Sequence, residues 1–284
     1  MSDIVEVRGL VIRNVDIHES DRLITIFTEE RGVLTAQAKS ARSLKSRKLA
    51  ATAPFCYASF QLYSKGDKYW VRECELLESF FDIRKTLPAL SLGAYILEVL
   101  SDVTVAEADR QLLRLSLNTL YAISRELYDT DKIKAAFELR AASILGFMPD
   151  VTACRNCGGN EGDFFLDIMD GTVECAACRA ERAVSLDRDV TYDGHEARII
   201  CPLSPGARTA MAYCIYAPLE KLFSFRLPPD DMRLFSRAAE EYITNHLERG
   251  FHTLDFYHEV TKKSKPAKTA VSKETVDDAE DSKR

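Results

Sequence analysis

Four cysteines stand in the spacing C-x2-C-x17-C-x2-C, and this pattern constrains the fold more than any other feature of the chain. They are Cys154, Cys157, Cys175 and Cys178. Two thiolate pairs on tight turns supply the four soft ligands of a closed tetrahedral Zn²⁺ site. Because the cysteines fill every ligand position, no position remains open for an activated water. The spacing therefore predicts a small zinc ribbon that holds one structural Zn²⁺ ion.

The residues between the cysteine pairs are typical of a β-hairpin. Apolar segments 164–169 and 172–173 flank Asp170-Gly171, a dipeptide that favours a tight turn. Gly158 and Gly159 follow the first pair, where positive φ would let the backbone fold back toward the sulfurs. The alternatives for such cysteines are a pair of disulfides, four unrelated buried thiols and an iron–sulfur cluster. The N-terminus lacks the pattern of a signal peptide, so we expect a reducing compartment, which disfavours disulfides.

Length and charge distribution predict more than one domain and a basic surface. At roughly 150 residues per domain, 284 residues fit two domains with room for a small insertion. No apolar run reaches the roughly 20 residues needed to span a bilayer, so no membrane association is expected. The net charge is −6, yet residues 31–72 contain nine lysines and arginines and one acid, Asp67. This asymmetry predicts a basic binding surface on an otherwise acidic molecule.

The periodicity of apolar residues divides the chain into a β-rich part, two helical parts and a tail. The strand-like segments, rich in β-branched and aromatic residues, are 7–17, 23–28, 33–38, 55–64 and 69–76. Five such strands fit a small barrel. Helical spacing runs from Pro88 to Leu145; Ser204-Pro205 predicts a helix cap, and a last helix starts at Pro229, with Gly250 at its far end. The predicted units are 1–80 (barrel), 81–150 and 184–260 (two parts of a helical domain), 151–183 (zinc ribbon) and 261–284 (disordered tail).

A hairpin in the barrel carries a candidate nucleic-acid-binding face. The segment 65–68 places Gly66 at the first central position of a type II′ turn and pairs Lys65 with Lys68. Counting outward pairs Tyr63 with Trp70 and Gln61 with Arg72. One face then carries Tyr57, Gln61, Tyr63, Lys65, Lys68, Trp70 and Arg72, and the barrel interior receives Ala58, Phe60, Leu62 and Val71. Aromatic rings interleaved with cations stack bases and neutralise phosphates. The alternative is that Trp70 and Tyr63 pack beneath a neighbouring helix.

A basic segment just upstream is a second candidate for phosphate binding. It contains Lys39, Arg42, Lys45, Arg47 and Lys48 and no acid. A loop of this composition between two strands can reach phosphates. The alternative is an ordinary solvated surface, but the adjoining aromatic face favours phosphate binding. The other cysteines, Cys56, Cys74, Cys201 and Cys214, are interpreted as small core residues.

Several short motifs resemble the signature of the RecO family of bacterial recombination mediators. They are Val11-Ile12-Arg13, Glu19-Ser20-Asp21-Arg22, Phe27-Thr28-Glu29-Glu30-Arg31-Gly32, Ala38-Lys39-Ser40-Ala41-Arg42, Pro54-Phe55, Ala94-Tyr95 and Gly146-Phe147-Met148-Pro149. The resemblance covers roughly residues 5–250. It implies an α+β multidomain fold: an N-terminal OB-fold β-barrel, an all-α helical domain and the zinc ribbon that part of the family carries. Val33 and Ser40 depart from the family, which more often has Lys and Gly there, and Asp170-Gly171 replaces a glycine pair.

The resemblance implies a cytoplasmic, nucleoid-associated DNA-handling protein that is not an enzyme. Such proteins bind single- and double-stranded DNA, anneal complementary strands, contact the acidic C-terminal tail of single-stranded DNA-binding protein, and join RecR to help load RecA. The residues themselves suggest a mechanism for binding and annealing. A basic loop and an aromatic face would hold one strand by contacts that ignore sequence, which leaves base edges free to meet a complement.

Two other classes of function compete with this interpretation. A metal-dependent nuclease would rest on hard ligands for Mg²⁺ at Asp187, Asp189, Asp193, His195 and Glu196, although their spacing matches no known motif. A zinc-ribbon adaptor of RNA metabolism or transcription would prefer RNA through 2′-hydroxyl contacts, whereas a stacking face tolerates either sugar. The turn at 19–22 is interpreted as a local Asx-type turn. No ligand partners are expected for His18, His246, His252 and His258.

Overall fold

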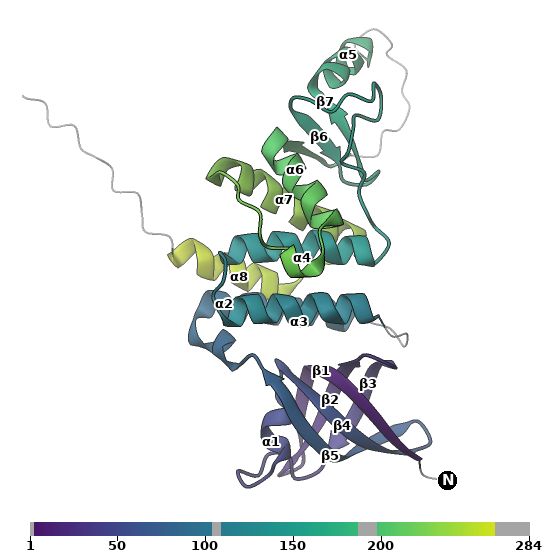
Figure 1. Ribbon diagram of the computed structural model, residues 1–284, viewed down its shortest axis with the longest axis vertical. Coiled ribbons are helices and arrows are strands. Elements are labelled where there is room, and N and C mark those ends of the chain that lie inside the picture. Colours follow the sequence, from purple (N-terminus) through teal and green to yellow (C-terminus); the bar gives the residue numbers. More distant parts are fainter. Residues whose placement is uncertain (1–2, 104–108, 187–197, 265–284) are drawn as a thin grey trace, which may run out of the picture.

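The computed structural model describes residues 3–103, 109–186 and 198–264. Figure 1 shows a β-barrel at one end of the molecule, a helical domain in the middle and a small module around β6 and β7 at the other end. The predicted fold class, an OB-like barrel followed by helices with a cysteine cluster, is confirmed. Within the described ranges, no helix is long and apolar enough to cross a membrane.

Five strands close the N-terminal barrel in the order β1-β2-β3-β5-β4. Their bounds are β1 Asp3–Ile17, β2 Asp21–Thr28, β3 Gly32–Ala38, β4 Cys56–Lys65 and β5 Lys68–Ser79. The five predicted strands are therefore confirmed, with small differences at their ends. Neighbours pair antiparallel except β3 and β5, which are parallel and joined only through Ala36–Tyr69 and Gln37–Trp70.

Strand β1 is long enough to pair with two neighbours. Its first half pairs with β4 and its second half with β2. The two pairings overlap at Gly9 and Leu10. At Gly9 a Cβ atom would lie 2.6 Å from the carbonyl oxygen of Phe27, so only glycine fits. A bulge between Val11 and Arg13 then changes which side chains face outward. Beyond it, Arg13 and Val15 point to solvent.

The barrel has its own apolar interior. Ala58, Phe60, Leu62 and Val71 are all buried there, as the hairpin register predicted. One end of the barrel is closed by a short helix, α1 Lys48–Ala51, whose Ala51 joins the same core. The segment expected to be a plain loop between two strands therefore ends in a helical turn.

Helices between the barrel and the cysteine module form the helical domain. Their bounds are η1 Phe81–Lys85, α2 Leu87–Val103, α3 Arg110–Ser124, α4 Thr130–Ile144, α6 Pro205–Tyr216, η2 Leu219–Lys221, α7 Pro229–His246 and α8 His252–Ser264. The predicted cap is confirmed, because the hydroxyl of Ser204 accepts the N–H of Ala207 at 3.1 Å. The prediction for Gly250 is wrong: α7 ends at His246, and Glu248, with a φ of 50°, takes the left-handed position.

The cysteine module contains a three-stranded sheet of order β7-β6-β8. Its elements are β6 Phe164–Asp167, β7 Thr172–Cys175, helix α5 Ala176–Leu186 and β8 Ile200–Leu203. The sequence assigned residues 200–203 to the helical domain, which is wrong, because β8 pairs with β6 along its length. The hairpin connection is also wider than predicted: strand β6 ends at Asp167, and the N–H of Gly171 donates to the carbonyl of Asp167 at 2.9 Å.

One continuous apolar core runs from the cysteine module through the helical domain to the near end of the barrel. Phe55 packs the barrel against α2, and its backbone has a φ of 66°, which is rare for a bulky residue. Its ring occupies a notch at Gly93, where a Cβ atom would approach it to 3.0 Å. Helix α8 continues to Ser264, so the predicted disordered tail starts too early. Residues 265–284 lie outside the described ranges.

Candidate nucleic-acid interface and metal centre

The four cysteines of the C-x2-C pairs converge on one cage. Cys154 and Cys157 come from a loop, Cys175 ends β7, and Cys178 lies in the first turn of α5. Their sulfurs all lie within 4.8 Å of one another, so the cage could hold a metal ion. Gly158 has the predicted positive φ of 72° and its N–H donates to the Cys154 carbonyl, which closes the knuckle.

The size of the cage fits a single tetrahedral ion. Bonds of about 2.3 Å to a tetrahedral centre separate the sulfurs by about 3.8 Å, and Sγ of Cys157 and Sγ of Cys175 are 3.8 Å apart. Backbone N–H groups point at the sulfurs: Cys175 donates to Cys154 Sγ at 3.3 Å and Gly159 to Cys157 Sγ at 3.4 Å. All eight cysteines of the chain lie in described residues, and no two of them are joined by a disulfide in this structure, which favours a metal site for the four in the cage.

The β4–β5 hairpin has the predicted register near its tip. Lys65 faces Lys68 and Tyr63 faces Trp70, with Gly66 at a φ of 60° as the first central position requires. The two aromatic rings lie 5.8 Å apart at 52°. Both rings lie on the barrel exterior: Tyr63 is exposed, and Trp70 is half-buried. This end of the hairpin pairs with the start of β1, far from the helical domain (Figure 1), so the described helices of that domain do not cover it.

Farther from the tip, the predicted register is wrong. A bulge shifts the pairing so that Gln61 faces Glu73 rather than Arg72. Arg72 remains exposed next to the hairpin face. Tyr57 faces outward too, but it lies at the opposite end of β4, where its hydroxyl donates to Glu29. Burial raises the pKa of Tyr57, and the Glu29 carboxylate raises it further.

A chain of hydrogen bonds links the hairpin to the basic segment. The indole Nε1 of Trp70 donates to Gln37 Oε1 at 3.2 Å, and Gln37 Nε2 donates to Asp21 Oδ2 at 3.0 Å. The other oxygen of Asp21 accepts the backbone N–H of Ser40 at 2.8 Å. The Ser40 N–H is the main cause that lowers the pKa of Asp21, against a smaller effect of burial. Asp21 therefore does more than form the local turn that the sequence suggested.

The basic segment is a surface loop from Lys39 to Arg47, and we call it the basic loop. Among the described residues, Lys39, Lys45 and Arg47 meet no hydrogen-bond or ion-pair partner and are exposed. Their charges are free to meet phosphates. Arg42 is engaged instead, because its Nε lies 3.2 Å from the Asp16 carboxylate and its Nη1 donates to the Glu19 carbonyl.

Lys48 has a structural contact. Its Nζ donates to the carbonyl of Val71 at 2.8 Å, beyond the point where the pairing of β3 and β5 stops. The carbonyl would otherwise lack a partner in that gap, so the ammonium of Lys48 helps to close the barrel. Of the five basic residues predicted for this segment, three are therefore free cations and two are bound to the protein itself.

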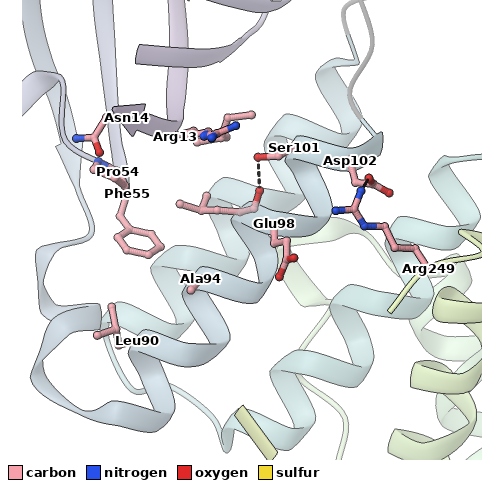
Figure 2. Close-up of a pocket in the computed structure, with 12 residues that line it drawn as sticks. Arg13, Asn14, Pro54, Phe55, Leu90, Ala94, Glu98, Ser101, Asp102 and Arg249 are labelled. Carbon is pink, nitrogen blue, oxygen red and sulfur yellow. Dashed lines mark hydrogen bonds and ion pairs between the residues drawn. The ribbon is translucent and has the colours of Figure 1, made fainter. Parts of the chain in front are cut away.

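A pocket of about 660 Å³ lies where the barrel meets α2. Figure 2 shows the ring of Phe55 pointing toward Leu90 and Ala94, with Arg13 and Asn14 of β1 on the other side. The polar groups on its far wall are paired within the helical domain: Arg249 with Asp102, and Glu98 with Thr253 at the start of α8. The pocket therefore lies at the interface between the barrel and the helical domain.

The remaining predictions concern the acidic cluster and the histidines. The acidic cluster from Asp187 to Glu196, on which a nuclease would rest, lies outside the described residues. His258 Nε2 donates to the Glu240 carboxylate at 2.9 Å, and His246 Nδ1 contacts the carbonyl of Tyr242. Among the described residues, neither histidine belongs to a group of three or more side chains that could hold a metal ion. No local pattern in the sequence predicted a functional position at Gln37. Its side chain bridges Trp70 and Asp21 only because β3 and β5 lie side by side in parallel.

Comparison with known proteins covers most of the chain. The family model described as Recombination protein O N terminal matches residues 1–80, which contain the whole barrel. The model described as Recombination protein O C terminal matches residues 84–192. Both matches follow the division between barrel and helical domain.

Individual relatives agree with these models. A DNA repair protein RecO of Acetivibrio thermocellus is 32% identical over 250 residues, which cover 87% of this chain and 94% of that protein. A DNA repair protein RecO of Alkaliphilus metalliredigens is 28% identical and covers 89% of this chain and 98% of that protein. The similarity therefore extends over barrel, helices and cysteine module alike.

Proposed function

The chain belongs to the RecO family of DNA repair proteins, and from this premise we propose that it is a recombination mediator that acts by binding rather than by catalysis. It binds single- and double-stranded DNA without sequence specificity and anneals complementary strands. With RecR it assists the loading of RecA, and it meets the acidic C-terminal tail of single-stranded DNA-binding protein. It works in the cytoplasm, associated with the nucleoid.

The observation that carries the DNA-binding part is the link between the aromatic hairpin and the basic loop. Trp70 and Ser40 are connected through Gln37 and Asp21 by hydrogen bonds of 2.8 to 3.2 Å. Rings that stack bases and cations that meet phosphates therefore lie on one side of one barrel. Contacts of both kinds ignore base identity, which suits a protein that must handle any sequence.

The metal proposal rests on the cage geometry and on ligand chemistry. Four thiolates in a tetrahedral arrangement favour Zn²⁺, and a cage filled by four cysteines suits a structural ion. The cage lies at the opposite end of the molecule from the barrel (Figure 1), so we assign Zn²⁺ to the stability of the ribbon and not to DNA contact.

Strand annealing tests the proposed function. Two labelled complementary oligonucleotides are mixed with the protein, with and without single-stranded DNA-binding protein, in Mg²⁺. We expect faster formation of intact duplex, including from strands already coated. Cut strands would favour the nuclease instead, and a marked preference for RNA strands would favour an RNA adaptor. The variant Arg226→Gln is a control, because it removes an exposed cation of the helical domain and keeps every cation of the barrel. We expect it to anneal the strands as fast as the unmodified protein.

A further inference from the structure

A row of outward side chains crosses every strand of the barrel. The strand register gives its members in order as Val15, Leu23, Gln37, Trp70, Tyr63 and Ile4. We call these six residues the outer row. Each member is the direct cross-strand neighbour of the next, so the row follows the hydrogen-bonding direction around the barrel.

The outer row is apolar where a barrel exterior is usually polar. Ile4 is 53% exposed, Val15 42%, and Leu23 and Tyr63 each 37%. Single exposed apolar residues need no explanation, but a contiguous series marks an interaction surface. Gln37 is the only polar member, and its side-chain oxygen is occupied by the indole N–H of Trp70.

Cations flank the row on both sides of its centre. Lys65 and Lys68 lie two residues from Tyr63 and Trp70 toward the hairpin tip. On the other side, Arg72 follows Trp70 by two residues on β5, and Lys39 follows Gln37 by two residues at the start of the basic loop. All four are exposed. Two acids share this second side, because Asp21 lies two residues from Leu23 and Glu6 lies two residues from Ile4. The apolar row, with four cations beside its centre, matches one nucleic-acid strand, with bases on the row and phosphates beside it.

We propose that the outer row is the path of single-strand bases across the barrel, and that Leu23 and Ile4 contact bases beyond Trp70 and Tyr63. The proposal rests on the proposed function and names where one strand lies. Strands are about 4.8 Å apart, so the four members from Leu23 to Tyr63 extend over about 14 Å, enough for several successive bases. A duplex hides its base faces in the stack, so it meets the cations and not the row.

Replacing Ile4 and Leu23 by alanine tests the path. We compare the double variant Ile4→Ala/Leu23→Ala with Leu77→Ala, because Leu77 is 45% exposed on β5 and lies outside the row. Fluorescence anisotropy measures the affinity for a labelled oligothymidine and for a duplex of equal length. We expect the double variant to bind the single strand about tenfold more weakly and the duplex within about twofold of the unmodified protein. Leu77→Ala should change neither.

Two further measurements show whether a loss of affinity comes from the outer row itself. Thermal unfolding shows whether the variants fold, and the salt dependence of single-strand binding should stay unchanged in the double variant, because it keeps every cation that meets a phosphate. An equally weakened affinity for both forms of DNA, or an unchanged affinity for both, would overturn the proposed path. If the unmodified protein itself binds neither form, the proposed function fails before the path is tested, so the two failures are distinguishable.

Discussion

The indole N–H of Trp70 donates to the side-chain oxygen of Gln37 over 3.2 Å, across the one place where β3 and β5 run parallel. This bond fixes the orientation of the ring on the barrel surface. The side-chain nitrogen of Gln37 donates in turn to Asp21, and Asp21 also accepts the backbone N–H of Ser40 at the start of the basic loop. The surface that would stack bases and the loop that would meet phosphates are therefore positioned by one carboxylate.

Removing charge from the basic loop should weaken all DNA binding alike. The variant Arg42→Gln/Lys45→Gln/Arg47→Gln removes two free cations, Lys45 and Arg47, whereas Arg42 already pairs with Asp16 and contributes less. We expect the slope of log affinity against log salt to fall by about 1 for each phosphate that no longer meets a cation, irrespective of sequence. Titrations at several salt concentrations measure it, with Arg226→Gln as control. An unchanged slope would remove the loop from the DNA site.

Replacing Ser40 by glycine should stabilise the protein. The φ of Ser40, 54°, lies in the left-handed region, where a side chain is strained and glycine is not. We expect Ser40→Gly to raise the free energy of unfolding by up to about 1 kcal/mol, because relief of strain exceeds the extra freedom of the unfolded chain. Thermal unfolding measures it. A lower melting temperature would show that the serine hydroxyl stabilises the turn more than its backbone costs.

The cysteine cage should bind one equivalent of Zn²⁺. Elemental analysis measures the metal, and we expect Cys175→Ser to lose it and to loosen the ribbon, because structural zinc binding contributes directly to folding. DNA affinity should decline only modestly, since the barrel lies at the other end of the molecule (Figure 1). Cys74→Ser, outside the cage, is the matched control. Iron in place of zinc, or a metal-free protein of full stability, would contradict the assignment.

Lys134 and Glu138 form a buried ion pair in the helical core, and the hydroxyl of Tyr95 also donates to Glu138. Lys134→Met should cost about 3–5 kcal/mol, because it removes the ammonium that pairs with the buried carboxylate of Glu138 and with Glu240. The double variant Lys134→Met/Glu138→Leu should recover much of this stability. Chemical denaturation of the unmodified protein and the two variants measures both values, and a double variant no more stable than Lys134→Met would contradict the pairing.

The cost of Lys134→Met should also depend on pH. Burial raises the pKa of Glu138 to about 7, although Lys134 opposes the shift, so removing the lysine raises the pKa further. A carboxyl whose pKa is higher in the folded state than in the unfolded one stabilises the fold at low pH and loses that effect as pH rises through the folded pKa. We therefore expect the variant to be less destabilised at pH 5 than at pH 8. An effect independent of pH would show that Glu138 is not the group left unpaired.

Local patterns predicted much of this structure because they act over short stretches of chain. The alternation of apolar residues placed Phe60 and Leu62 in the barrel, and Ser204-Pro205 marked the start of a helix. The spacing of the four cysteines alone located the metal cage. In each case the residues that decide the structure are neighbours in sequence or recur at a short, fixed spacing.

Features that depend on distant pairing could not be predicted in the same way. Strand β8 is only four residues long, and it forms a strand because its backbone pairs with the free edge of β6. The bulge at Arg72 shifts the hairpin register without any local signal. The outer row was missed for the same reason: Ile4, Leu23 and Trp70 are far apart in sequence, and only barrel closure aligns them.

Trp70→Ala separates stacking on DNA from packing within the protein. The ring lies half-buried on the barrel exterior beside Tyr63. We expect single-strand affinity to weaken by about 1–3 kcal/mol, the range for removal of one base stack, with little change in melting temperature. A ring buried in a core would instead cost about 3–5 kcal/mol of stability. A large fall in melting temperature would therefore contradict the surface assignment.

Fluorescence of Trp70 tests the central claim most directly, because it is the only tryptophan of the chain. An oligothymidine is titrated into the unmodified protein while anisotropy of a label on the DNA reports binding in the same sample. If a single strand lies on the barrel against this ring, emission falls and saturates together with the anisotropy. If the anisotropy shows full binding while the emission of Trp70 stays unchanged, the strand lies elsewhere and the proposed interface is wrong.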